Sequence, residues 1–189
     1  MNTVFTLSYP LPAVDRREVR RYAGMTGRDA QVETLIDECV SKLPPITGRV
    51  CYTEIGTAEL IHRSHDLGRC IADCRSLIVM AATVGVEPDR LIARYASISP
   101  SAALIYQAVG AERIECLCDV FEADLRSKGY ETRPRFSPGY GDLPLDFQRN
   151  IFAILDCAKK IGLSLNESLS MSPSKSVTAI IGIKRKDPT

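Results

Sequence analysis

An irregular stretch, residues 133–145, carries the side chains best suited to contact a small molecule. It reads Arg-Pro-Arg-Phe-Ser-Pro-Gly-Tyr-Gly-Asp-Leu-Pro-Leu, with three prolines and two glycines in thirteen residues. Prolines fix their own φ and push the preceding residue toward extended backbone, while a glycine such as Gly139 permits positive φ or close main-chain approach. We therefore expect a stiff, extended loop that presents Arg135, the backbone of Ser137 and the ring of Tyr140. The same composition also fits an ordinary connection between a helix and a strand.

A second group of possible ligands is formed by the only two histidines and two nearby cysteines: His62, His65, Cys70 and Cys74. These residue types suit zinc, but a short helix and a strand rarely close such spacing into a tetrahedron. The cysteines also fit an apolar core, and the histidines fit a polar turn. We therefore expect no metal site, with a zinc protein as the alternative.

Common catalytic signatures are absent from the chain. It has no Gly-x-Ser-x-Gly, no Gly-x-x-x-x-Gly-Lys-[Ser/Thr] and no Gly-x-Gly-x-x-Gly, which argues against a serine hydrolase of that type, a phosphate-binding loop and a Rossmann methyltransferase. Lys175 between two serines resembles a phosphate-binding trio, although a turn before a strand explains it better. No catalytic residue is predicted.

Composition indicates an ordinary globular protein. The chain has 189 residues, 45% of them hydrophobic and 25% charged, and a net charge of +1 without a polybasic run. We expect one domain over residues 1–189, with neither nucleic acid nor a membrane as partner. The longest apolar run, Leu77–Ala82, is too short to span a bilayer. The first residues lack the features of a signal peptide, and the seven cysteines include no Cys-x-x-Cys, so we expect a cytoplasmic protein with reduced thiols.

Hydrophobic periodicity predicts a mixture of helices and strands in irregular order. Residues 1–14 are expected to form an extended arm. The expected helices and strands are a helix capped by Asp15 and running through Tyr22, helices at 30–43, 66–74 and 88–95, a helix beginning at Pro100 with Ser99 as its cap, a helical stripe from Ala111 to Gly129, a helix at 147–161, and strands at 49–55, 60–62, 75–85 and 177–183. The irregular order favours an α+β fold with a twisted, mostly antiparallel sheet and flanking helices.

The stripe from Ala111 defines two faces of a helix. Its apolar residues, expected to face a core, are Ile114, Leu117, Cys118, Phe121 and Leu125. Its opposite face, expected to be solvated, carries Glu112, Glu115, Asp119, Glu122 and Arg126. By itself this charged face indicates only a solvent-exposed helix surface.

Two blocks of the sequence resemble the reactivation domain of cobalamin-dependent methionine synthase. The first, Arg135-Phe-Ser-Pro-Gly-Tyr140, is similar to the family's Arg-x-Ala-Pro-Gly-Tyr. The second, Glu167-Ser-Leu-Ser-Met-Ser-Pro-Ser-Lys-Ser-Val-Thr178, is similar to Glu-Ser-x-x-Met-x-Pro-x-x-Ser-Val-Ser. The resemblance covers about residues 99–183 and is poor over 1–60.

The resemblance implies a twisted antiparallel sheet with helices and a site for S-adenosylmethionine. Arg135 would bind the ligand carboxylate with two hydrogen bonds, and the backbone around Ser137 and Gly139 would meet the adenosine or ribose. A helix carboxylate, Glu115 or Asp119, would lie near the sulfonium and ammonium. The tyrosine of Pro-Gly-Tyr, here Tyr140, would lie on the side that faces cobalamin.

The sequence also departs from the resembled family. It lacks the Asp-x-His-x-x-Gly motif that holds cobalamin in another domain of methionine synthase, has Leu143-Pro144 in place of Cys-Pro, and ends soon after Ile183, where the family continues. The resemblance therefore implies that a partner holds the cobalamin. That partner would be a cobalamin-dependent methionine synthase or another corrinoid protein, with an electron donor such as flavodoxin or ferredoxin. The alternative is a module that senses S-adenosylmethionine or a related metabolite without contacting a corrinoid.

Overall fold

Five strands form the main sheet, in the order β1-β2-β3-β7-β4, and every neighbouring pair is antiparallel. The computed structural model describes residues 2–27 and 29–185. The strands of this sheet are β1 (Phe5–Pro10), β2 (Thr47–Gly56), β3 (Ser76–Thr83), β4 (Tyr130–Thr132) and β7 (Ser176–Arg185), and a separate ribbon pairs β5 (Ser164–Leu165) with β6 (Met171–Ser172). Strand β4 pairs only with the C-terminal part of β7, so the rest of that edge of β7 faces the chain that follows β4.

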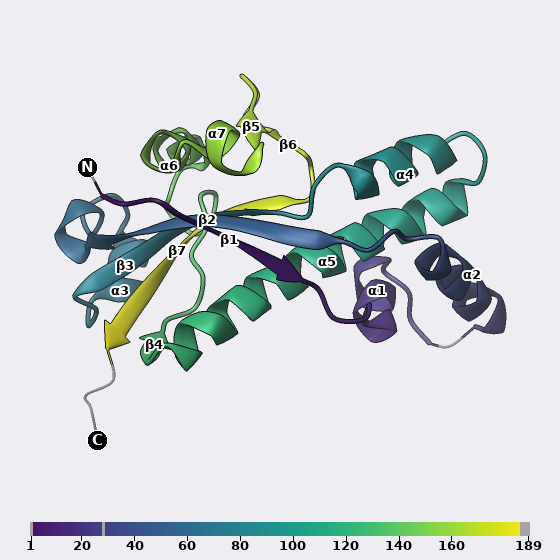
Figure 1. The fold of residues 1–189 in the computed structure, drawn as a ribbon, viewed down its shortest axis with the longest axis horizontal. Helices are drawn as coiled ribbons and strands as arrows, with labels where there is room; N and C mark the ends of the chain where they lie inside the picture. Colours follow the sequence, from purple (N-terminus) through teal and green to yellow (C-terminus); the bar gives the residue numbers. More distant parts are fainter. Residues whose placement is uncertain (1, 28, 186–189) are drawn as a thin grey trace.

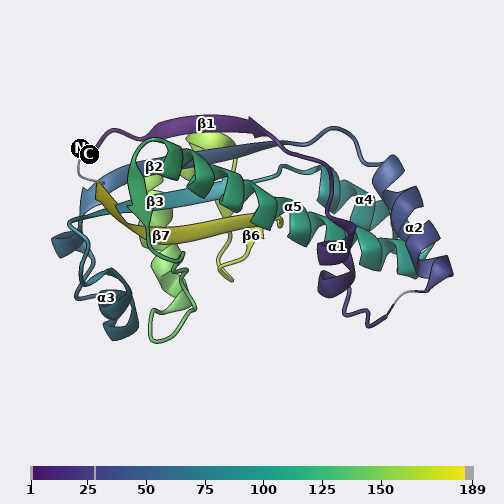
Figure 2. The ribbon, with the colours of Figure 1, turned by 90° about the horizontal axis from the view of Figure 1, so that it is seen from below.

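Helices cover both faces of the sheet and extend beyond one end of it (Figures 1 and 2). They are α1 (Arg16–Tyr22), α2 (Ala30–Ser41), α3 (His65–Ile71), α4 (Glu87–Tyr95), α5 (Pro100–Ser127), α6 (Gln148–Leu155) and α7 (Cys157–Ile161), with 3-10 turns at Thr57–Glu59 and Leu145–Phe147. Figure 1 shows α6 and α7 on one side of the sheet and α5 on the other, with α1, α2 and α4 gathered around the first part of α5.

The alternation of side chains along β3 gives each face of the sheet its own apolar core. Leu77 and Val79 pack with residues of α3, α6 and α7 on one face. Ile78 and Met80 pack with the apolar stripe of α5 on the other. Since β3 is buried on both faces, its sequence is continuously apolar rather than alternating.

The longest helix, α5, joins the sheet to the helices at the end of the molecule. It has 28 residues, so it is about 42 Å long at 1.5 Å per residue. The side chain of Ser99 caps its first turn, Pro100 begins it, and Gly129 follows its end at φ +87°. We call α1, α2, α4 and the first half of α5 the helical lobe, because their apolar residues form a third core of their own.

A buried ion pair in the middle of α5 fastens this lobe to the end of β1. Glu112 and Arg113 are 4% and 3% exposed, and Arg113 Nε donates to Glu112 Oε2 at 2.5 Å. Arg113 also donates to the carbonyls of Pro12 and Ala13, and Glu112 accepts from the N–H of Asp15. Both charges are therefore compensated by each other and by backbone groups about a hundred residues away in sequence.

The structure confirms the predicted α+β class and its antiparallel sheet, and corrects several elements. The expected arm at residues 1–14 contains β1, since residues 5–10 pair with β2. Residues 60–62 form a turn rather than a strand. The expected helix at 147–161 is divided into α6 and α7, because Asp156 adopts φ +50° between them. The expected helix from Pro100 and the stripe from Ala111 are one helix, and Glu112 is buried rather than solvated.

We predict that Glu112→Ala lowers the free energy of unfolding by about 3–5 kcal/mol, because it leaves the guanidinium of Arg113 buried without its partner. Urea denaturation of the two proteins measures the difference. Glu18→Ala is the matched control: Glu18 pairs with Arg21 on the exposed surface of α1, so its loss should change stability by less than about 1 kcal/mol. Equal effects of the two substitutions would contradict the role given to Glu112.

Candidate functional site

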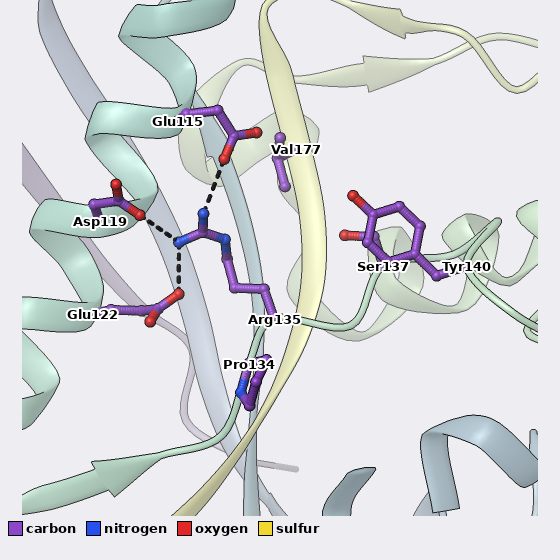
Figure 3. Close-up of a pocket in the computed structure, with 8 residues that line it drawn as sticks. All are labelled: Glu115, Asp119, Glu122, Pro134, Arg135, Ser137, Tyr140 and Val177. Atoms are coloured by element: carbon purple, nitrogen blue, oxygen red, sulfur yellow. Dashed lines mark hydrogen bonds and ion pairs between the residues drawn. The ribbon is translucent and has the colours of Figure 1, made fainter. Parts of the chain in front are cut away.

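Three carboxylates of α5 converge on the guanidinium of Arg135. Glu115, Asp119 and Glu122 are spaced by four and three residues, which places them on one face of the helix. Arg135 Nη2 donates to Glu115 Oε2 at 2.9 Å, and its Nη1 donates to Asp119 Oδ1 at 2.9 Å and to Glu122 Oε1 at 2.6 Å. Figure 3 shows Arg135 reaching from its loop toward these carboxylates. We call these four residues the arginine cluster.

The members of the arginine cluster differ in their access to water. The side chains of Glu122 and Arg135 are 13% and 21% exposed, whereas those of Glu115 and Asp119 are 43% and 71% exposed. Burial opposes the charge on Arg135, but the hydrogen bond with Asp119 and the neighbouring carboxylates outweigh it and raise the pKa of Arg135. Arg135 therefore carries a permanent positive charge, with Glu122 as its inner partner and the other two carboxylates at the solvent side.

The loop that carries Arg135 is hydrogen-bonded to the open edge of β7. Arg133 N donates to Gly182 O at 2.8 Å, and Phe136 exchanges two hydrogen bonds with Ile180, at 2.9 and 2.8 Å. These bonds hold Arg135 between two fixed points, at the gap between α5 and the sheet. The stiff loop predicted from the prolines is thus fixed by β7 as well as by its composition.

Beyond Phe136 the chain forms a compact turn around Gly139 and Tyr140. Tyr140 N donates to Ser137 O at 3.0 Å, Gly139 N donates to Leu143 O at 2.8 Å, and Gly139 has φ +92°. That φ favours glycine over every residue with a side chain. The ring of Tyr140 is 58% exposed and meets Phe136 edge-on, with the ring centroids 6.2 Å apart.

These elements enclose a pocket of about 360 Å³. Its size falls in the range of small-molecule sites, roughly 300–1,000 Å³. It is lined by Glu115, Asp119, Glu122, Pro134, Arg135, Ser137, Tyr140 and Val177 (Figure 3). Three carboxylates and one guanidinium give the lining a formal charge of −2, so the pocket favours a cationic ligand.

The structure brings together most of the residues that the sequence singled out. Arg135, Ser137, Tyr140 and Glu115 all line the pocket. Gly139 does not line it, and its N–H is used within the turn, so its contact with a ligand stays a prediction. Asp119, expected as an alternative to Glu115, lines the pocket together with it.

Sequence reasoning missed Glu122 and Val177. Glu122 was assigned to the solvated face of the helix, yet it makes the shortest contact with Arg135 and also accepts a hydrogen bond from Arg126 at 3.1 Å. Its spacing of seven residues from Glu115 was the available signal, since two helical turns return a side chain to the same face.

The remaining candidate groups do not form a second centre within residues 2–27 and 29–185. No group of three or more His, Cys, Asp or Glu in this part of the chain could hold a metal ion. Of the proposed zinc ligands, Cys74 is buried, and His65 has a side chain 77% exposed.

Burial raises the pKa of Cys118, on the sheet side of α5, to about 12, which keeps this thiol protonated. In the part of the chain that the structure describes, no helix is long and apolar enough to cross a membrane.

Lys175, the centre of the possible phosphate-binding trio, has protein partners. Its Nζ donates to Gln107 Oε1 at 2.6 Å, and its stem covers Gly110 of α5 so closely that a Cβ there would lie 2.7 Å from the lysine Cε. Ser174, its neighbour, donates through its hydroxyl to Asp89 at 2.5 Å. These contacts support the interpretation of this segment as the turn that leads into β7.

The chain matches the profile of a known family and is similar in fold to a solved structure. The profile of the family described as "Vitamin B12 dependent methionine synthase, activation domain" matches residues 79–187, more than half of the 189-residue chain. Among solved structures, the crystal structure of the MetH reactivation domain bound to AdoHcy superimposes with a TM-score of 0.69 at 15% sequence identity, covering 100% of this chain and 80% of that chain. No curated protein sequence matches significantly.

The two comparisons cover different parts of the chain. The family profile begins within β3 and includes α5, the loop of Arg135 and β7, whereas the structural match extends over the N-terminal third as well. At 15% identity the structural match supports the fold, and the profile supplies the family. The chain belongs to the family of vitamin B12-dependent methionine synthase activation domains.

Proposed function

We propose that the chain binds S-adenosylmethionine in the pocket of the arginine cluster and supports the reductive methylation of cob(II)alamin held by a separate protein. The observation that carries this proposal is that the loop of Arg135, which lies within the part of the chain matched by the family profile, and three carboxylates of α5 line one pocket of suitable size. The partner is a cobalamin-dependent methionine synthase or another corrinoid protein.

The charges of the pocket fit those of the ligand. S-adenosylmethionine carries a carboxylate, an ammonium and a sulfonium, so its net charge is positive, while the pocket lining has a formal charge of −2. Binding of the ligand carboxylate to Arg135 would release Glu115 and Asp119, whose side chains face solvent. These two carboxylates would then receive the ammonium and the sulfonium, and Glu122 would keep Arg135 in place. Ion pairs within the protein are thus exchanged for ion pairs with the ligand, which limits the cost of desolvation.

Reductive methylation of cob(II)alamin depends more on the positioning of the methyl donor than on acid–base groups. One electron from a donor such as flavodoxin or ferredoxin, together with the sulfonium methyl group, converts cob(II)alamin to methylcobalamin and leaves S-adenosylhomocysteine. The residues of this chain would bind the amino acid end of the ligand, hold the methyl group toward the pocket mouth and limit access of water. A site without a nucleophilic thiolate or a histidine pair is consistent with that role.

The exposed ring of Tyr140 marks the side of the pocket from which the partner would approach. Aromatic residues held rigidly at a protein surface often anchor interfaces. Tyr140 is 58% exposed although its turn is closed by backbone hydrogen bonds. The corrin ring of the partner offers a flat, largely apolar surface to such a residue.

We predict that Arg135→Ala weakens S-adenosylmethionine binding at least tenfold, since removing a charged hydrogen-bond partner costs about 1.5–3 kcal/mol. Titration calorimetry compares the affinities. Arg126→Ala is the control: Arg126 pairs with Glu122 but does not itself line the pocket, so this variant should bind S-adenosylmethionine nearly as tightly as the wild type. No binding by the wild type, or equal affinities of wild type and Arg135→Ala, would refute the assignment of the pocket.

Reactivation is expected only in the presence of a partner protein. The assay combines this protein, S-adenosylmethionine, a low-potential reductant and a methionine synthase without its activation domain, and follows the absorbance of methylcobalamin. We predict that Tyr140→Ala slows its recovery about tenfold or more, as for an interface anchor, even when S-adenosylmethionine is saturating. Phe5→Ala, which removes an aromatic ring 50% exposed on β1, should have no effect. If the truncated synthase recovers equally well without this protein, the chain is instead a sensor of the metabolite.

A further inference from the structure

The turn that carries Tyr140 is attached to α3 through the carboxylate of Asp142. Asp142 Oδ2 accepts from His65 N at 2.8 Å, and its Oδ1 accepts from Asp66 N at 3.1 Å and from the hydroxyl of Ser64. The same hydroxyl accepts from Leu67 N at 2.9 Å. Asp142, a residue 76 positions away from Asp66 in sequence, thus supplies most of the N-terminal capping of α3.

The attachment has the character of a charged interaction. The hydroxyl of Ser64 and the N–H groups of Asp66 and His65 lower the pKa of Asp142 to about 2, so the carboxylate is ionised at neutral pH. Hydrogen bonds to an ionised acceptor are stronger than neutral ones, and a negative charge is favoured at the N-terminus of a helix.

The backbone beside Asp142 is shaped to allow this contact. Gly141 has φ +51°, and a Cβ at this position would lie 2.4 Å from Asp66 Oδ2. A side chain at residue 141 would therefore crowd the side chain of Asp66, and the positive φ favours glycine here as well. On the other side, Leu143 is 1% exposed in the core and accepts from Gly139 N at 2.8 Å.

Tyr140 directly precedes both anchors and is held in the same turn. Its own backbone N–H and carbonyl are hydrogen-bonded within the turn, to Ser137 O and Leu143 N, each at 3.0 Å. The main chain of Tyr140 is thus fixed, and the residue is 58% exposed while it also lines the pocket.

We propose that Asp142 is the positioning residue for Tyr140, and that its bond to α3 holds the ring at the place where the partner's corrin arrives. The effect of Asp142 on reactivation rests on the proposed function. The attachment itself can be tested without a partner. Asp142 does not line the pocket, so it acts on the reaction through Tyr140 and not through contact with the ligand.

Asp29 provides a matched control for the loss of a helix cap. It caps α2 by accepting from Gln31 N at 2.7 Å and from Val32 N at 3.4 Å, and α2 belongs to the helical lobe, away from the pocket. Asp29→Ala and Asp142→Ala each remove one capping carboxylate. If Asp142 served only as a helix cap, the two variants would lose similar stability and would show the same reactivation rate and ligand affinity. Only the helix that loses its cap would differ.

Hydrogen exchange measured by mass spectrometry tests the attachment in the protein alone. In Asp142→Ala, exchange within residues 137–143 should rise at least tenfold, whereas Asp29→Ala should leave these residues unchanged. Asp142→Asn should raise exchange by a smaller factor, since its single amide oxygen can accept either from Asp66 N and the Ser64 hydroxyl or from His65 N but not from both sides, and it serves as the test variant if Asp142→Ala fails to fold. Unchanged exchange of residues 137–143 in Asp142→Ala would overturn the proposal.

A double-mutant cycle with Tyr140→Ala tests the catalytic consequence. Asp142→Ala should slow methylcobalamin recovery about tenfold while leaving S-adenosylmethionine affinity within about threefold, and it should have almost no further effect once Tyr140 is alanine, because coupled residues are not additive. Additive effects, or an equal loss in Asp29→Ala, would overturn the positioning role. Absence of recovery with the wild type would count against the proposed function, and the exchange comparison would then decide the attachment alone.

Discussion

The packing of α5 against the sheet determines where every charged group of the pocket lies. Leu117 and Phe121 are completely buried against β3 and its neighbours, which fixes the rotation of the helix about its axis. With 3.6 residues per turn, that rotation leaves one row of side chains at the boundary between the core and the solvent. Glu115, Asp119 and Glu122 occupy this row, and the open edge of β7 places the loop of Arg135 opposite to it. The pocket is thus a consequence of how an amphipathic helix covers a sheet.

Elements with a strong local signal could be predicted from the sequence. The apolar run of β3, the caps formed by Asp15 and Ser99, and the end of α5 before Gly129 all agree with the structure. So does the irregular loop around Arg135. In each case the residues that determine the element lie within it or directly beside it, so a pattern of a few residues contains the information.

Other features depend on distant partners and could not be predicted. Strand β1 ends at Pro10, is followed by Pro12, and exists because β2 lies beside it. Glu112 is buried because its charge is met by Arg113 and the N–H of Asp15, nearly a hundred residues away in sequence. Glu122 was expected to be solvated for the same reason: its helix position is equally compatible with solvent and with a guanidinium brought there by the loop. The sequence thus shows how charged residues are spaced on a helix, but it does not show which groups they pair with.

The two halves of the loop are held by different parts of the fold, which separates two tasks. The half with Arg135 is fixed by β7 through Arg133 and Phe136, and its guanidinium pairs with the largely buried Glu122. The half with Tyr140 is fixed by α3 through Asp142. A ligand that exchanges partners within the arginine cluster need not move the ring of Tyr140, and a partner that docks on Tyr140 need not disturb the ion pairs. The proposed function, in which a methyl donor stays in place while a second protein arrives and leaves, would require this kind of independence, and separate anchors for the two halves of one loop would provide it.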